Sequence, residues 1–189
     1  MLASTPTPAN LSALRARAES HLKEQAWNDC IAACRSLLQL DPRHHFAQET
    51  LATALLQIGE TGAAISAVHR LLELSPRDPL HRLRYATLLQ MENQHGAAAR
   101  EFDRIVAMYP DAPFSADARD AIEALDRLQT SHILMMAAEH DEFRWKLERD
   151  MGALLEENDF YLSENGAESL RQMIPNSEIE VEARAPKLH

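Results

Sequence analysis

Apolar residues recur at the i, i+3, i+4 and i+7 positions along most of the chain, and polar residues fill the positions between them. This spacing is typical of amphipathic helices that bury one face. Alanine and leucine are abundant, whereas the β-branched and aromatic residues that favour strands are sparse. The pattern therefore predicts an all-α protein.

The helical pattern is divided at regular intervals. Pro42, Pro76 and Pro110 follow one another 34 residues apart, each after an apolar residue and one further residue. Two equal intervals of 34 residues are typical of a helix-turn-helix repeat. A single helix pair cannot bury its own apolar face, so about three stacked pairs are needed for a stable core.

The residues between these prolines resemble the tetratricopeptide repeat (TPR) family over about residues 11–110. The second unit is the most similar, and the third follows the same register. The positions that match are Leu51, Ala52, Leu55, Gly59, Gly62, Ala64, Val68 and Leu71, then Tyr85, Ala86, Leu89, Ala98, Phe102 and Ile105. The first unit has Ala18, Cys30, Cys34 and Leu37, but Arg17 and His21 replace the usual apolar residues.

The resemblance implies a TPR-type right-handed superhelix of three helix pairs, with a long capping helix and a C-terminal two-helix module. We expect a flexible lead at 1–10, repeats at 11–44, 45–78 and 79–112, a capping helix within 113–140, a helical module at 141–174 and an extended or disordered tail at 175–189. Asp41, Ser75 and Asp78 are residue types that cap helix N-termini.

The capping helix is predicted over 116–139. Its apolar stripe comprises Ala118, Ile122, Leu125, Leu128, Ile133 and Met136. Asp117, Asp120, Glu123 and Asp126 should face solvent, and the apolar stretch Leu134–Ala137 should be covered by another element. In the module, helices are expected over 142–157 and 164–173, with Ser163 as an N-cap and with Leu170 and Met173 facing inward.

Residues 141–174 also show a second, weaker resemblance. It rests on Glu142-Phe143-Arg144, Leu147, Asp150, Leu154-Leu155-Glu156, Phe160-Tyr161-Leu162-Ser163 and Leu170-Arg171. This segment is similar to the nitrile-hydratase-like leaders of ribosomally synthesised natural-product precursors. That family usually has Gly where this chain has Asp159. The resemblance implies that a modifying enzyme recognises the module.

The TPR resemblance places a ligand in a concave groove lined by the first helix of each pair. The residues implied are Arg15, Leu22, Lys23, Phe46, Glu49, Thr53, Leu56, Leu80, Leu83, Arg84, Thr87 and Met91. Their mixture suits an amphipathic helix or apolar peptide, with Arg15, Lys23 and Arg84 for its carboxylates. Some TPR domains bind the C-terminal carboxylate of a chaperone through Lys, Asn and Arg. Glu19 and Leu80 occupy two of those positions in this chain, so this kind of ligand is disfavoured. The alternative occupant is the protein's own C-terminal helices.

The remaining residues that could carry out chemistry, the cysteines and histidines, fit a structural role better than a catalytic one. Cys30 and Cys34 share one helix face, and core packing fits them better than a redox or metal pair. The nine His form no metal motif, and no nucleophile pair, phosphate-binding Gly loop or dinucleotide fingerprint is present. We therefore expect neither a cofactor, a metal nor an enzyme activity.

The charge distribution limits which kinds of partner the chain can bind. The net charge is −10, and nearly all of the excess negative charge lies after Asp111. This disfavours nucleic acid and suits a partner with a basic surface. With no apolar run long enough to span a bilayer and no signal peptide, the sequence predicts a cytoplasmic protein-interaction scaffold. There are two alternatives. A partner could recognise the C-terminal module, or copies of the chain could assemble through the first repeat, 11–44, and the stretch Leu134–Ala137.

Overall fold

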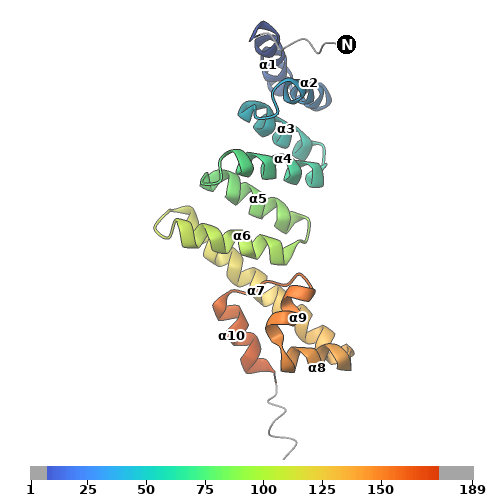
Figure 1. The fold of residues 1–189 in the computed structure, drawn as a ribbon, viewed down its shortest axis with the longest axis vertical. Coiled ribbons are helices and arrows are strands. Elements are labelled where there is room, and N and C mark those ends of the chain that lie inside the picture. The colour runs from blue at the N-terminus through green and yellow to red at the C-terminus, as the bar shows by residue number, and fades with distance from the viewer. Residues whose placement is uncertain (1–7, 175–189) are drawn as a thin grey trace, which may run out of the picture. The chain divides into compact units, whose positions relative to one another are not determined.

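The chain is helical throughout the part that the computed structural model describes, residues 8–174 (Figure 1). Those residues form α1 (Pro8–Lys23), α2 (Trp27–Leu40), α3 (His45–Gln57), α4 (Thr61–Leu74), α5 (Pro79–Met91), α6 (His95–Met108), α7 (Phe114–Glu139), α8 (Asp141–Arg149), α9 (Met151–Glu157) and α10 (Glu164–Met173), with no strand among them. The all-α prediction is confirmed. Helix α1 already begins at Pro8, inside the predicted lead, and the predicted tail lies outside the described residues.

The helices form two compact units that divide between Asn93 and Gln94. The first unit holds α1–α5 and the second holds α6–α10. The division falls inside the predicted third repeat, 79–112, so its two helices belong to different units. No helix in residues 8–174 is long and apolar enough to cross a membrane.

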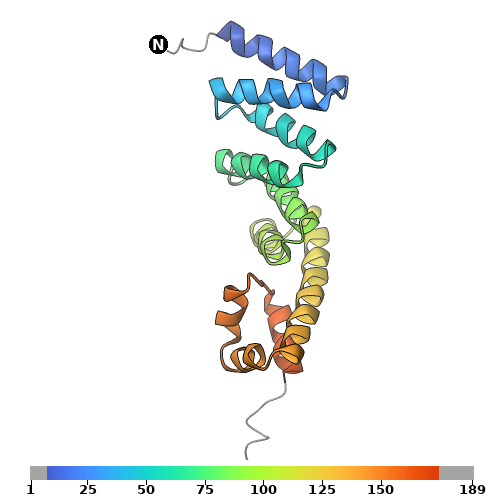
Figure 2. The same ribbon diagram turned by 90° about the vertical axis from the view of Figure 1, so that its right-hand side faces the viewer.

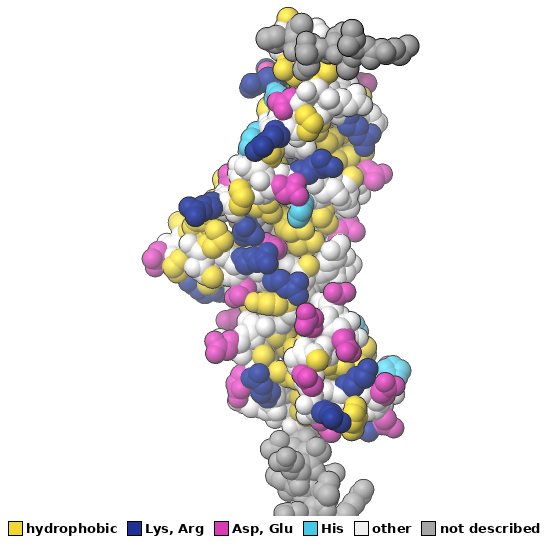
Figure 3. All heavy atoms as spheres, in the orientation of Figure 1, with side chains coloured by type: hydrophobic (Ala, Val, Ile, Leu, Met, Phe, Trp, Pro, Cys, Tyr) yellow, Lys and Arg dark blue, Asp and Glu magenta, His cyan; other side chains and the backbone are white. Residues whose placement is uncertain are grey.

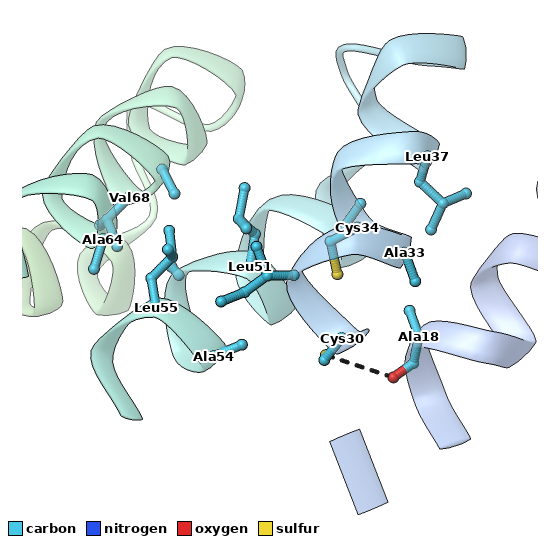
Figure 4. Packing of buried hydrophobic residues seen from close by; sticks show 14 of the residues in the cluster. Ala18, Cys30, Ala33, Cys34, Leu37, Leu51, Ala54, Leu55, Ala64 and Val68 are labelled. Carbon is cyan, nitrogen blue, oxygen red and sulfur yellow. Dashed lines mark hydrogen bonds between the residues drawn. The ribbon is translucent and has the colours of Figure 1, made fainter. Parts of the chain in front are cut away.

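In the first unit, each helix packs against the next one along the chain, and α1 also contacts α3 (Figure 2). The predicted small residues lie where helices meet: Ala18, Ala52, Ala64 and Ala86 have no exposed surface. A methyl group at these crossings lets the helix axes approach closely. Figure 4 shows the resulting core, in which Cys34 of α2 lies near Leu51 of α3, and Leu55 of α3 lies near Ala64 and Val68 of α4.

The 34-residue period is visible in the backbone itself. Gln25, Gly59 and Asn93 occupy corresponding turns, and all three have positive φ, at 56°, 81° and 58°. Only the second turn has the glycine that this conformation favours. The sequence repeat therefore corresponds to a repeated turn geometry even where the residue type has changed.

Of the three predicted caps, only Asp78 caps a helix N-terminus. Its carboxylate accepts hydrogen bonds from the backbone N–H of Leu80 at 2.9 Å and of His81 at 3.2 Å. The prediction was wrong for Asp41 and Ser75, which end α2 and α4 instead. Each is followed by a turn of three residues, 42–44 and 76–78, before the next helix begins.

In the second unit, the C-terminal helices cover the apolar end of α7. Ile133 and Ala137 of α7 are buried with a set of apolar residues from the module, namely Phe143, Leu147, Leu154, Leu162 and Leu170. This confirms that the stretch Leu134–Ala137 is covered by another element, although Met135 remains exposed. Leu128 and Met173, predicted to face inward, are also exposed. They lie at the edges of their helices' apolar stripes.

The predicted helix over 142–157 is divided into α8 and α9 at Asp150. Asp150 has φ −149° and ψ 80°, and its carboxylate accepts a hydrogen bond from the backbone N–H of Ala153 at 3.0 Å. Asp is a strong N-cap residue, so it both ends α8 and starts α9. The module therefore contains three helices rather than two.

Two buried polar side chains of α7 hold the loop between α9 and α10. The amide of Gln129 donates to the carbonyl of Tyr161 at 2.8 Å and accepts from its N–H at 3.0 Å. Asp126 accepts from the N–H of Ser163 at 2.9 Å and from the Ser163 hydroxyl. The prediction that Asp126 faces solvent was wrong, because the loop requires its carboxylate. Ser163 caps α10 as predicted.

The same loop approaches α6 closely at Gly96. A Cβ atom at Gly96 would lie 2.0 Å from the carbonyl oxygen of Asp159. Asp159 has φ 57°, the left-handed conformation, at the position where the leader family has Gly. The Tyr161 hydroxyl donates a hydrogen bond to Asp103 of α6 at 2.7 Å. Burial is the main cause that raises the pKa of Tyr161 to about 12, and this hydrogen bond is the second cause. The module is thereby fixed to α6 as well as to α7.

Gly96→Ala tests this close approach. The added methyl group would meet backbone rather than a movable side chain, so we expect a loss of about 1–3 kcal/mol in the free energy of unfolding. Gly62→Ala is the matched control, because a Cβ there meets nothing within 4 Å. It should be neutral or stabilise by about 0.5–1 kcal/mol. Urea unfolding followed by circular dichroism measures both, and equal stabilities for the two variants would contradict the packing of the loop on α6.

Candidate peptide-binding face

All twelve residues predicted to line the groove lie on α1, α3 and α5, within the first unit. Arg15, Leu22 and Lys23 are on α1; Phe46, Glu49, Thr53 and Leu56 are on α3; Leu80, Leu83, Arg84, Thr87 and Met91 are on α5. We call this set the α1–α3–α5 face. On α5, Leu80, Thr87 and Met91 are separated by close to whole numbers of helical turns, so they form one stripe.

Helices α1 and α3 meet on this face through Arg15 and Phe46. The Arg15 guanidinium lies 4.9 Å from the centroid of the Phe46 ring, and its Nε donates to Glu19 at 2.9 Å. A cation over an aromatic ring is attracted by the ring's quadrupole. Arg15 therefore already has an aromatic and an acidic partner, which makes it a weaker candidate for a ligand carboxylate than the sequence predicted.

Helices α3 and α5 meet through Arg84, which donates to the Thr53 hydroxyl at 2.9 Å. Partial burial lowers the pKa of Arg84, and the nearby Glu49 carboxylate acts in the opposite direction. His81 also lies here, with its Nε2 3.9 Å from Glu49 and 3.7 Å from Asp78. Sequence reasoning missed His81, because only the tertiary structure brings it opposite Glu49.

The apolar members of the face divide into two groups. Leu22, Phe46, Leu56 and Leu83 are half-buried, and the first three pack against the core of the first unit. Leu80 and Met91 are 65% and 57% exposed. The apolar surface left for a partner thus lies mainly near the two ends of α5. Across the surface drawn in Figure 3, such exposed hydrophobic side chains are interspersed with basic and acidic ones.

The two cysteines belong to the core rather than to a site. Both lack exposed surface, and the Cys30 thiol lies 3.7 Å from the carbonyl oxygen of Ala18, as Figure 4 shows. Burial, reinforced by Cys30, raises the pKa of Cys34 to about 12. This burial agrees with the core packing that the sequence favours for the pair. Within residues 8–174, no three His, Cys, Asp or Glu side chains are grouped so that they could hold a metal ion.

Solved structures with the same fold are TPR domains. The type III secretion chaperone SycD of Yersinia enterocolitica, solved with a peptide of the translocator YopD, is similar with a TM-score of 0.56 and 16% identity over 65% of this chain and 97% of that chain. The first TPR of Spaghetti (RPAP3), bound to an HSP90 peptide, gives 0.54 and 14% over 65% and 98%. The TPR2B domain of yeast Sti1, in an Hsp70 complex, gives 0.51 and 14% over 62% and 97%.

At these identities the likeness establishes the fold. The chain has a TPR-type fold. No protein-family model matches the sequence, and no curated protein matches it.

The burial of Cys30 and Cys34 predicts their reactivity. A raised pKa keeps a thiol protonated, and the thiolate is the reactive form, so neither cysteine should react with a thiol reagent at pH 8 in the folded protein. Both should react at once in denaturant. Titration with Ellman's reagent, with and without guanidinium chloride, measures this. Rapid reaction of two thiols in the native protein would contradict the core assignment.

Proposed function

We propose that the protein is a non-catalytic interaction scaffold that holds a peptide or amphipathic helix on the α1–α3–α5 face. Three proteins with the same fold were solved with peptides or peptide complexes, which supports peptide binding as the use of this fold. Fold alone does not determine function, so the proposal rests on the side chains of the face itself.

The observation that carries the proposal is the exposure of Leu80 and Met91 on one stripe of α5. Large apolar side chains exposed on a common face are typical of interaction surfaces. These two residues are separated by about 16 Å along the helix axis, at 1.5 Å per residue. A partner helix of about three turns, with apolar residues near both ends, would contact both.

The polar side chains between them add selectivity. Arg84 is half-buried between α3 and α5, where its hydrogen bond to Thr53 fixes its position. Lys23 is exposed at the end of α1. A ligand carboxylate near Arg84 would gain a charge-assisted hydrogen bond from an already oriented guanidinium. The face therefore suits an amphipathic helix that carries acidic residues beside its apolar stripe.

Leu80→Glu combined with Met91→Glu should abolish partner binding and leave the fold intact. Both side chains are exposed, and Leu80 is near the N-terminus of α5, where an acidic residue is favourable. The measurement is a pull-down from the source cell's lysate, quantified by mass spectrometry. Met135→Glu, at an exposed apolar residue of α7, is the control and should retain the partner. Equal retention by both variants would contradict the α1–α3–α5 assignment.

The second candidate is recognition of the C-terminal module, and an exposed tryptophan favours it. Trp145 of α8 is 55% exposed, with the Arg149 guanidinium 5.0 Å from its ring centroid. The pair borders a hollow of about 170 Å³ that Ala153, Leu154 and Glu157 of α9 also line. Trp and Arg are the residues most often dominant in protein interfaces. A modifying enzyme or another partner would meet this surface.

Trp145→Ala distinguishes the two candidates. If the module is the recognised element, this variant should lose the partner, because truncating an interface tryptophan typically costs about 2 kcal/mol or more. If the α1–α3–α5 face is the site, Trp145→Ala should bind like the natural protein. The same quantitative pull-down measures the effect, with circular dichroism to show that helicity is unchanged.

A further inference from the structure

A hollow of about 390 Å³ lies between α2 and α4 in the first unit, with α3 as its floor. The floor and walls are largely apolar: Leu38 of α2, Leu51 and Leu55 of α3, and Ala63 and Ala67 of α4. These α3 residues occupy a different side of the helix from Glu49 and Thr53, so the hollow is separate from the α1–α3–α5 face. Its volume lies within the range of clefts that bind ligands.

Two arginines flank this hollow, Arg35 on α2 and Arg70 on α4. Both are exposed. Across residues 8–174, neither guanidinium has a hydrogen bond or an ion pair, whereas Arg15, Arg84 and Arg104 each have one. Two unpaired cations on either side of an apolar floor produce a local positive field that attracts carboxylates.

The floor also holds a side-chain amide that has no hydrogen-bond partner within the described part of the chain. Gln48 is only 2% exposed and lines the hollow, yet its side chain makes no hydrogen bond with any residue in the described range. Gln129, buried to the same 2%, makes paired hydrogen bonds to the backbone of Tyr161. Buried polar groups in folded proteins are nearly always hydrogen-bonded. The amide of Gln48 is therefore available to a ligand, and it offers both a donor and an acceptor.

We propose that this hollow binds an acidic peptide segment of a partner protein. One large apolar side chain of the peptide enters the hollow and packs on Leu51 and Leu55. The peptide backbone hydrogen-bonds with the amide of Gln48, as the backbone of Tyr161 does with Gln129. Acidic residues on either side of the apolar one pair with Arg35 and Arg70. A free anion would leave the apolar floor uncovered, and an uncharged peptide would leave both guanidiniums unpaired, so an acidic apolar segment fits best.

This second site is independent of the proposed function and would let the scaffold hold two chains at once. The test uses a displayed library of random short peptides, selected on the full chain. The enriched sequences should combine Asp or Glu with Leu, Ile, Met or Phe. A labelled synthetic copy of the most enriched peptide is then titrated with the natural chain and its variants by fluorescence anisotropy.

Arg35→Glu combined with Arg70→Glu should weaken binding of that peptide about tenfold or more, because two attractive contacts become repulsive. Gln48→Ala should also weaken it. Arg17→Glu combined with Arg43→Glu is the matched control, with the same charge change on exposed residues of the same unit, and should bind nearly as tightly as the natural chain. Circular dichroism on each variant confirms an unchanged fold.

Four results would overturn the proposal. Enriched peptides without acidic residues would refute the role of the two arginines, as would undiminished binding to the Arg35→Glu and Arg70→Glu variant. An equal loss in the Arg17→Glu and Arg43→Glu control would show only general attraction to basic charge. Loss in the Leu80→Glu and Met91→Glu variant alone would place the peptide on the α1–α3–α5 face, which would support the proposed function while refuting this site.

Discussion

Close approach of neighbouring helices at alanine is the contact on which the first unit depends. Ala18, Ala52, Ala64 and Ala86 are fully buried where helices cross, so large side chains can pack beside each crossing rather than between the axes. This arrangement buries the apolar side chains beside the crossings and leaves other sides of the helices exposed or half-buried. Exposed and half-buried residues of α1, α3 and α5 make up the proposed binding face, and the space between α2 and α4 forms the hollow with Arg35 and Arg70.

The second unit is held together in another way. Its C-terminal helices cover the apolar end of α7, but their position depends on specific polar contacts from Asp126 and Gln129 to the loop at Tyr161–Ser163. Close packing at Gly96 adds a constraint that a larger residue would break. A partner that recognises residues 141–174 would therefore meet a folded surface. Removing these residues would expose Ile133 and Ala137, which makes point variants better probes of this unit than truncations.

The sequence predicts the helices, their period and the buried alanines because these features depend on local spacing. The Ser163 cap and the covered end of α7 follow from local patterns too. The break at Asp150 was not predicted, since the apolar spacing continues across it. The burial of Asp126 was not predicted either, because its partner Ser163 is distant in sequence and acidic residues usually face solvent. Similarly, the positions of the groove residues on α1, α3 and α5 follow from the repeat, whereas the pairing of Arg15 with Phe46 requires the tertiary structure.

The proposed function requires the α1–α3–α5 face to hold the partner. Hydrogen-exchange mass spectrometry of the full chain, with and without a partner captured by it, tests this most directly, because it maps protection along the whole backbone. A partner bound on this face should slow exchange in α5 (Pro79–Met91), with smaller effects in α1 and α3. Protection confined to α8–α10, with exchange in α5 unchanged, would contradict it.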